Sequence, residues 1–175
     1  MGGARPRSPY VVETLTPRHD RETFSCGRPE LDRYLREHAG QDARRAVAVP
    51  YVAVEPGRAT VAGYFTLSAF GVTLHDLPEA IVRRLPRYPQ VPATLLGRLA
   101  VDARHQGKRL GELLLLEALS RTLETSRRVA SAAVVVDAVD ASAHPFYRHF
   151  EFIPFRDDPR RLFLPMQAIA ALLRA

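Results

Sequence analysis

Residues 98–119 run from an apolar stretch through a polar turn into a leucine-rich stretch. The turn places two glycines within a run of positive charge, in the order Arg104, His105, Gln106, Gly107, Lys108, Arg109, Leu110 and Gly111. A strand that enters such a turn and continues as a helix leaves the first helical amides without partners inside the helix. These donors, together with the positive end of the helix dipole, favour an anion such as a phosphate. A capped helix start without a ligand is the alternative interpretation.

The turn does not match either of two common nucleotide-binding patterns. A P-loop requires Ser or Thr directly after its lysine, and the dinucleotide fingerprint requires G-x-G-x-x-G. Here Lys108 is followed by Arg109, and Gly107 and Gly111 are four residues apart. Nucleotide cofactors of those two kinds are therefore disfavoured.

Alternating or continuous apolar runs predict the strands that position this turn. Seven segments have this pattern: 9–15, 47–55, 58–74, 93–102, 129–138, 150–155 and 160–166. Five segments have helical patterns: 29–45, a short stretch within 76–92, 108–125, 141–150 and 167–175. Alternation of the two types, with hairpins in the middle and at the end, predicts the α/β (α+β) class, with a mixed sheet of about six or seven strands and helices on both faces.

Three local signals add detail to these elements. In the helix at 29–45, the periodicity places Leu31, Tyr34, Leu35 and His38 on one face. The pair Thr16-Pro17 has the N-cap and first-turn proline of a further helix start. Pro56-Gly57 predicts the turn that makes 47–55 and 58–74 a hairpin.

Composition predicts one soluble domain with a polyanionic partner. The 175 residues are 46% apolar and 25% charged, and the net charge is +6. Lys108 is the only lysine, so the excess charge is arginine, which binds phosphate oxygens through a planar fork. A bias in genome base composition would explain the choice of arginine but not the excess. We expect residues 1–8 to be disordered, 9–175 to form one domain, and no metal to be bound.

Targeting signals are missing from the sequence. No apolar run reaches the ~20 residues that a membrane span requires, and no signal peptide is recognisable at the start. Cys26 has no second cysteine with which to form an internal disulfide. We therefore expect a cytoplasmic protein that does not bind membranes.

Three blocks of sequence carry a resemblance to a known family. "LAVDARHQGKRLGELLL" resembles the acetyl-coenzyme A motif of the GCN5-related N-acetyltransferases (GNAT), Q/R-x-x-G-x-G/A, at the start of the helix after the central strand. "PELDRYLREHAGQDARRAVAVPYVAV", "LLGRLAVD" and "AHPFYRHFEFIPFRDDPRRLFLPM" resemble the toxin subgroup of that family. The similarity extends over roughly residues 8–166.

The resemblance implies a GNAT fold, acetyl-coenzyme A as co-substrate and an activity. Toxins of this subgroup acetylate the amino group of aminoacyl-tRNA, which blocks translation, and are encoded beside a ribbon-helix-helix antitoxin. A homodimer is compatible with the subgroup. The implied cofactor-binding residues are Leu99, Ala100, Val101, Arg104, Gln106, Gly107, Lys108, Arg109, Leu110 and Gly111. The backbone of Leu99 and Val101 would pair with the pantetheine arm, and the amides of the turn would hold the pyrophosphate.

Arg109 departs from the motif, because the family has its first glycine at this position. A glycine there lets the backbone approach a phosphate closely. If Arg109 has ordinary helical dihedral angles, its side chain can point away from the phosphate or add a cation.

Tyr147 is the implied catalytic residue. A phenol with a pKa of ~10 is suited to protonate a departing thiolate. The alternative is that Tyr147 belongs to an aromatic core with Phe146, Phe150 and Phe152. An α-amino acceptor, with a pKa near ~8, needs no strong base. Spacing singles out no base among Glu55, Asp102 and His75, and His144 is more typical of a loop cap.

Two arginine clusters are the candidate tRNA contacts: Arg33, Arg36, Arg44 and Arg45, and then Arg83, Arg84 and Arg87. These arginines would contact the phosphates along a tRNA backbone. The alternative is that each cluster belongs to an ordinary solvent-exposed surface. Two other functions stay open. One is a GNAT enzyme that acetylates a small amine or a protein N-terminus. The other is a non-catalytic RNA-binding protein of the same fold.

Overall fold

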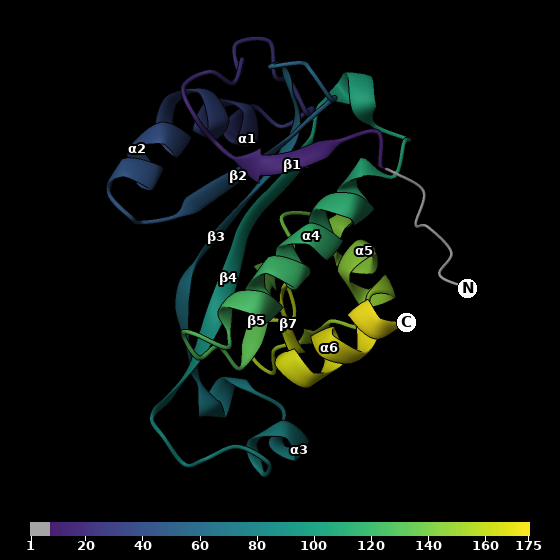
Figure 1. Ribbon diagram of the computed structural model, residues 1–175. Coiled ribbons are helices and arrows are strands. Elements are labelled where there is room, and N and C mark those ends of the chain that lie inside the picture. The colour runs from purple at the N-terminus through teal and green to yellow at the C-terminus, as the bar shows by residue number, and fades with distance from the viewer. Residues whose placement is uncertain (1–7) are drawn as a thin grey trace, which may run out of the picture. The chain divides into compact units, whose positions relative to one another are not determined.

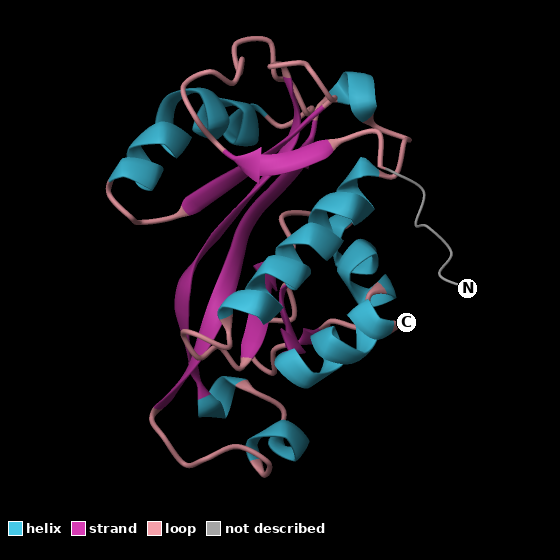
Figure 2. Cartoon of the chain, in the orientation of Figure 1, coloured by secondary structure: helices cyan, strands magenta, loops and turns pink. Residues whose placement is uncertain are grey.

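The computed structural model describes residues 8–175, which form a seven-stranded sheet and flanking helices (Figures 1 and 2). The strands are β1 Val11–Thr14, β2 Val49–Val54, β3 Val61–Thr73, β4 Gln90–Val101, β5 Ala133–Asp137, β6 Ile153–Pro154 and β7 Arg161–Pro165. The helices are α1 Pro29–Arg33, α2 Ala39–Arg44, α3 Glu79–Val82, α4 Leu110–Thr125, α5 Ala143–His149 and α6 Met166–Arg174. Short helical turns are η1 Tyr34–His38, η2 Leu74–Asp76 and η3 Ala103–His105. The predicted disorder of residues 1–8 falls outside the described chain, apart from the exposed Ser8.

The sheet is mixed, as the sequence predicts. Its order is β1-β2-β3-β4-β5-β7-β6. The β1–β2, β5–β7 and β6–β7 pairs are antiparallel, whereas β4 and β5 are parallel. The parallel step follows from the helical crossover between β4 and β5, because parallel neighbours need a long connection. The seven predicted strands are all present.

The chain divides into two compact units. The first comprises the chain up to Thr66 together with Arg98–Leu115, and the second comprises Leu67–Gly97 and Leu116–Ala175. Strands β3 and β4 and helix α4 each contribute residues to both units.

Helices cover both sheet faces in the first unit. Tyr64 of β3 packs in one core cluster with Leu31 and Tyr34 of the first helical segment. Successive strand residues point to opposite faces, and the preceding Gly63 faces α4. A Cβ atom on Gly63 would lie 2.8 Å from Leu114 Cδ1 and 3.1 Å from the Ala100 carbonyl oxygen, so a larger residue here would have to displace the packed Leu114 side chain.

The core of the second unit is built around β5. Val134, Val135 and Val136 are fully buried, as expected for a central strand with both faces covered. Val135 pairs with Phe163 of β7 in register, and Phe163 contacts the Phe155 ring edge-on at 5.4 Å.

The predicted helix start at Thr16-Pro17 is wrong. The segment forms a turn instead, in which the His19 amide donates to the Thr16 carbonyl at 3.1 Å. The Thr16 amide donates to His19 Nδ1 at 2.9 Å, and His19 Nε2 lies 2.6 Å from Glu13 Oε1. The buried His19 therefore bonds the amide and the carbonyl of Thr16, which would otherwise have bonded within a helix start.

The helix at 29–45 forms, but its buried face is corrected at one position. A π-helical turn, η1, interrupts it, and the Ala39 amide donates to the Tyr34 carbonyl, five residues back. One extra residue in the turn shifts the following positions around the helix. Ala39 is therefore buried in the place predicted for His38, and His38 is exposed.

Within residues 8–175, no helix is both long enough and apolar enough to cross a membrane.

Candidate functional site

The turn between β4 and α4 presents a series of unpaired backbone amides. The N–H groups of residues 106–112 donate to no other residue of the described chain. Gly107 has φ +78° and Arg109 has φ +63°, so the turn passes twice through the left-handed region before α4 begins. Consecutive free amides at a helix N-terminus are the donor set that a diphosphate requires. The residues present therefore fit the pyrophosphate of coenzyme A.

The three cations of the turn differ in their partners. Arg104 Nε lies 2.9 Å from Asp102 Oδ1, and the Arg104 guanidinium also reaches Thr23. Arg109 pairs with Glu112 at 2.9 Å. Lys108 is exposed and forms no ion pair with residues 8–175. Of the cations predicted for the phosphate, Lys108 is therefore the one whose charge no neighbouring carboxylate offsets.

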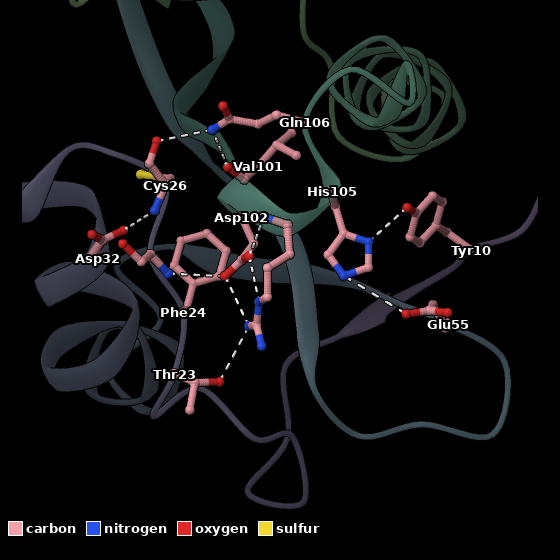
Figure 3. Close-up of polar contacts among 12 residues, drawn as sticks. Tyr10, Thr23, Phe24, Cys26, Asp32, Glu55, Val101, Asp102, His105 and Gln106 are labelled. Atoms are coloured by element: carbon pink, nitrogen blue, oxygen red, sulfur yellow. Dashed lines mark hydrogen bonds and ion pairs between the residues drawn. The ribbon is translucent and has the colours of Figure 1, made fainter.

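Asp102 anchors the turn to the segment around Ser25, within the first unit (Figure 3). Its side chain is only 1% exposed, and it accepts bonds from the Ser25 amide at 3.0 Å and from the Arg104 amide at 2.9 Å. Burial by itself raises the pKa of this carboxyl, but the bonds from Arg104 and Ser25 outweigh burial and lower the pKa to about 2. Asp102 is therefore a structural carboxylate, because both of its oxygens already accept hydrogen bonds within the protein.

Gln106 fixes the other side of the turn (Figure 3). Its Nε2 atom donates to the Val101 carbonyl at 3.0 Å and to the Cys26 carbonyl at 3.1 Å. The β4–β5 pairing is registered through Leu96, whereas β4 itself continues to Val101. Leu99, Ala100 and Val101 therefore lie on a part of β4 beyond its register with β5. The family resemblance implies that the pantetheine arm binds there.

Tyr147 lies on α5 in the second unit. It is 6% exposed, and its ring contacts Phe146 at 5.2 Å and Phe152 at 5.4 Å, so the predicted aromatic cluster is present. Burial, with a smaller effect of the Asp137 charge, raises the pKa of Tyr147 well above its ordinary value. The phenol therefore stays protonated across the physiological range.

Comparison with known proteins identifies the family. The sequence of residues 13–152 matches the acetyltransferase (GNAT) family. The chain belongs to this family. A tRNA-acetylating toxin of Mycobacterium tuberculosis (strain ATCC 25618 / H37Rv) is 36% identical over 154 residues, which cover 88% of this acetyltransferase and 90% of the toxin. The predicted family and its toxin subgroup are thus confirmed.

Solved structures extend the likeness to the whole fold. AtaT complexed with acetyl-methionyl-tRNAfMet is 28% identical, with a TM-score of 0.87, and the match covers 93% of this acetyltransferase and 98% of AtaT. A tyrosine-to-phenylalanine mutant of the AtaT toxin, bound to the C-terminus of the antitoxin AtaR and acetyl-CoA, is 26% identical with a TM-score of 0.81. That match covers 96% of this chain and 100% of the mutant. The predicted GNAT fold is confirmed.

All seven arginines predicted to contact tRNA are exposed in the acetyltransferase. The cluster at 33–45 belongs to the first unit and the cluster at 83–87 to the second. Arg33 pairs with Glu37 at 2.8 Å and Arg83 pairs with Glu79 at 2.9 Å. The remaining members, Arg36, Arg44, Arg45, Arg84 and Arg87, form no ion pair within residues 8–175.

Sequence reasoning did not find the polar chain beside the turn. The Tyr10 hydroxyl lies 2.8 Å from His105 Nδ1, and His105 Nε2 lies 3.8 Å from Glu55 Oε1 (Figure 3). Tyr10 and His105 are 95 positions apart, so no spacing signal could connect them. The contacts connect the entry to the turn with Tyr10, which precedes β1, and Glu55, which follows β2.

One group of three residues outside the turn has ligand atoms close together. His75, Asp76 and Asp157 offer atoms within 4.8 Å of one another. His75 Nε2 already lies 3.2 Å from Asp76 Oδ1. Exposed acidic groups are common without an ion, and the absence of a bound metal stays a prediction.

Proposed function

We propose that this acetyltransferase transfers the acetyl group of acetyl-coenzyme A to the α-amino group of aminoacyl-tRNA, and so acts as a toxin that blocks translation. The observation that carries the proposal is the similarity to the tRNA-acetylating toxin, which spans 90% of that toxin's length. The free amides of residues 106–112 support it, because they supply the donors that the cofactor needs.

Two parts of the cofactor have proposed contacts. The amides of the turn and the ammonium of Lys108 hold the pyrophosphate, while the backbone of Leu99 and Val101 holds the pantetheine arm. Because Arg104 and Arg109 are paired with carboxylates, they shape the turn more than they add charge to it. When bound, the cofactor supplies an acyl thioester.

The reaction needs a neutral amine, and an α-amino group with a pKa of ~8 is partly neutral at physiological pH. Among the candidate bases, Asp102 is enclosed by its own hydrogen bonds and Glu55 lies beside His105. No side chain has to act as a strong base. The neutral amine attacks the acyl carbon directly, so that a C–N bond forms while the C–S bond breaks.

Tyr147 is the proposed proton donor. Its raised pKa keeps the hydroxyl protonated, and this proton passes to the departing thiolate. Tyr147 Oη is left as a phenolate that regains a proton from the acetylated ammonium by way of solvent.

Two partners belong to the proposal. The exposed arginine clusters contact tRNA, and a ribbon-helix-helix antitoxin blocks them. Antitoxin binding is supported by the complex of AtaT with AtaR, and the type of antitoxin and a homodimer are part of the proposal. A cytoplasmic location follows from the proposed substrate.

The alternative of a non-catalytic RNA-binding protein is favoured by one observation. Arg109 has a left-handed backbone, φ +63°, where the family pattern has glycine, so the condition of ordinary helical dihedral angles is not met. Its side chain is 82% exposed and paired with Glu112, however, and so does not fill the turn.

The test uses labelled acetyl-coenzyme A with charged and uncharged tRNA. We expect label only in the charged fraction, and a rate about 100- to 10,000-fold lower for Tyr147→Phe. Tyr88→Phe, which removes the hydroxyl of an exposed tyrosine, is the matched control and should retain full activity. Equal labelling of simple amines would favour the small-amine alternative, and RNA retention without acetyl-coenzyme A consumption would favour the non-catalytic one.

A further inference from the structure

Arg98 of β4 lies on an aromatic surface in the first unit. Its guanidinium carbon is 3.5 Å from the centre of the Tyr34 ring. The Tyr34 hydroxyl donates to Asp42 Oδ2 at 2.7 Å, and the ring stacks on Tyr64 with 19° between their planes. The Tyr64 hydroxyl in turn donates to the Leu31 carbonyl at 2.8 Å. Each ring is thus held at both its face and its hydroxyl, which fixes the position of the cation above it.

The charge of Arg98 has no protein counter-ion. Arg98 is half-buried, and it forms no hydrogen bond or ion pair with any residue between 8 and 175. The contact with Tyr34 uses the face of the guanidinium and leaves its in-plane N–H donors free. By contrast, Arg33, which lines the same groove, is paired with Glu37. A half-buried, oriented and unpaired guanidinium is suited to bind an oxyanion through two parallel hydrogen bonds.

The same residues line an open groove of about 530 Å³. This volume lies within the ~300 to 1,000 Å³ that is typical of ligand sites. Arg33 and His38 lie along the groove beside Tyr34 and Arg98. The Glu30 carboxylate, which also lines it, is paired with Arg28 at 3.4 Å. The π-helical turn contributes both Tyr34 and His38, so the irregular helix shapes this surface.

We propose that Arg98 is a phosphate contact for the nucleic-acid acceptor, with its guanidinium fork on a phosphodiester oxygen of the strand that occupies this groove. This inference rests on the proposed function, and it adds a substrate contact outside the two exposed arginine clusters. The Tyr34 ring acts as the support that aims the fork.

The test compares two acceptors that differ by one cytidine and the phosphodiester that joins it: an aminoacyl-adenosine and the same amino acid on a cytidylyl-adenosine dinucleotide. For Arg98→Gln we expect KM for the dinucleotide to rise about 10- to 100-fold, the loss expected for a hydrogen bond to a charged group. KM for aminoacyl-adenosine and for acetyl-coenzyme A should not change. Arg98→Lys keeps the charge without the fork and should show a smaller rise. Arg128→Gln removes an exposed arginine after α4 and should have no effect.

An equal rise in KM for both acceptors would overturn the proposal. So would a rise confined to acetyl-coenzyme A, because the phosphate would then belong to the cofactor. The unchanged KM for acetyl-coenzyme A also shows that the variant is folded.

A binding measurement separates this inference from the proposed function. The affinity of a labelled single-stranded RNA is measured over a series of salt concentrations. Removing one phosphate contact should weaken binding and reduce the salt slope by about 0.7 units, the value for a single strand. If neither acceptor is acetylated, the proposed acetylation of aminoacyl-tRNA is wrong. The binding measurement still tests whether Arg98 contacts a phosphate. An unchanged slope for Arg98→Gln would overturn the role of Arg98.

Discussion

Arg109 has the backbone conformation of the family motif without the motif's glycine. The residue has the left-handed φ that the family pattern satisfies with glycine. For a residue with a Cβ atom this conformation costs about 1–2 kcal/mol. The exposed pair with Glu112 offsets little of that cost, because surface ion pairs are weak.

We therefore expect Arg109→Gly to raise the free energy of unfolding by up to about 1 kcal/mol, once the greater freedom of unfolded glycine is subtracted. Urea denaturation would measure the change. Arg109→Ala removes the same ion pair but keeps the strain, so it should not be stabilised. A glycine variant less stable than the alanine variant would contradict the interpretation.

The raised pKa of Tyr147 gives a pH dependence for the proposed reaction. The rate should increase as the acceptor amine, with a pKa of ~8, loses its proton. An ordinary tyrosine would ionise near pH ~10 and the rate would then fall. Because burial raises the Tyr147 pKa, kcat/KM should stay level through pH ~10. A fall beginning below pH ~9 would argue against Tyr147 as the donor.

At the scale of elements, the β4–α4 turn depends on Asp102. Replacing it with Asn removes the charge that accepts from Ser25 and Arg104, and the expected loss of stability is about 1–3 kcal/mol. Its folded pKa of about 2 is below the unfolded value. The stabilisation is therefore complete above pH ~4 and is lost as the pH falls toward 2.

The wild type and Asp102→Asn should therefore differ in melting temperature at pH ~7 and converge at low pH. Asp158→Asn, which removes an exposed carboxylate paired with Arg160, serves as the control. A constant difference from neutral to acidic pH would indicate that the charge of Asp102 is not what stabilises the turn.

Sequence patterns predicted the elements well where hydrophobic periodicity determines structure. The strand at 129–138 and the helix at 108–125 are formed as β5 and α4, because burial on the core follows the spacing of apolar residues. The Thr16-Pro17 signal failed, since His19 offers those backbone groups other partners. The shift from His38 to Ala39 depends on a π-helical turn, which periodicity does not encode.

The sequence predicted the free backbone amides of the site, but it did not predict which carboxylates pair with its arginines. The free amides follow from a helix that begins after a glycine turn, as expected. The pairing of Arg104 with Asp102 is local, but the contacts to Thr23 and Ser25 join segments far apart in the chain. Arg98 gave no signal in the sequence, because its isolation from carboxylates depends on the tertiary fold.

The single domain expected for residues 9–175 stays a prediction for the whole molecule. It is tested by whether the chain unfolds in one cooperative transition. Strands β3 and β4 and helix α4 each run through both compact units. Unfolding of either unit would therefore disrupt these three shared elements. We therefore expect one thermal transition, with equal calorimetric and van't Hoff enthalpies. Two resolved transitions would show that the units are separate domains.

Lys108 has a practical consequence for the study of this molecule. It is the only lysine of the chain, and it is exposed within the turn. Apart from the α-amino terminus, an amine-directed reagent therefore has one target. Mass spectrometry of that single modified peptide would then report directly on how completely a ligand shields the turn, without any need for turnover.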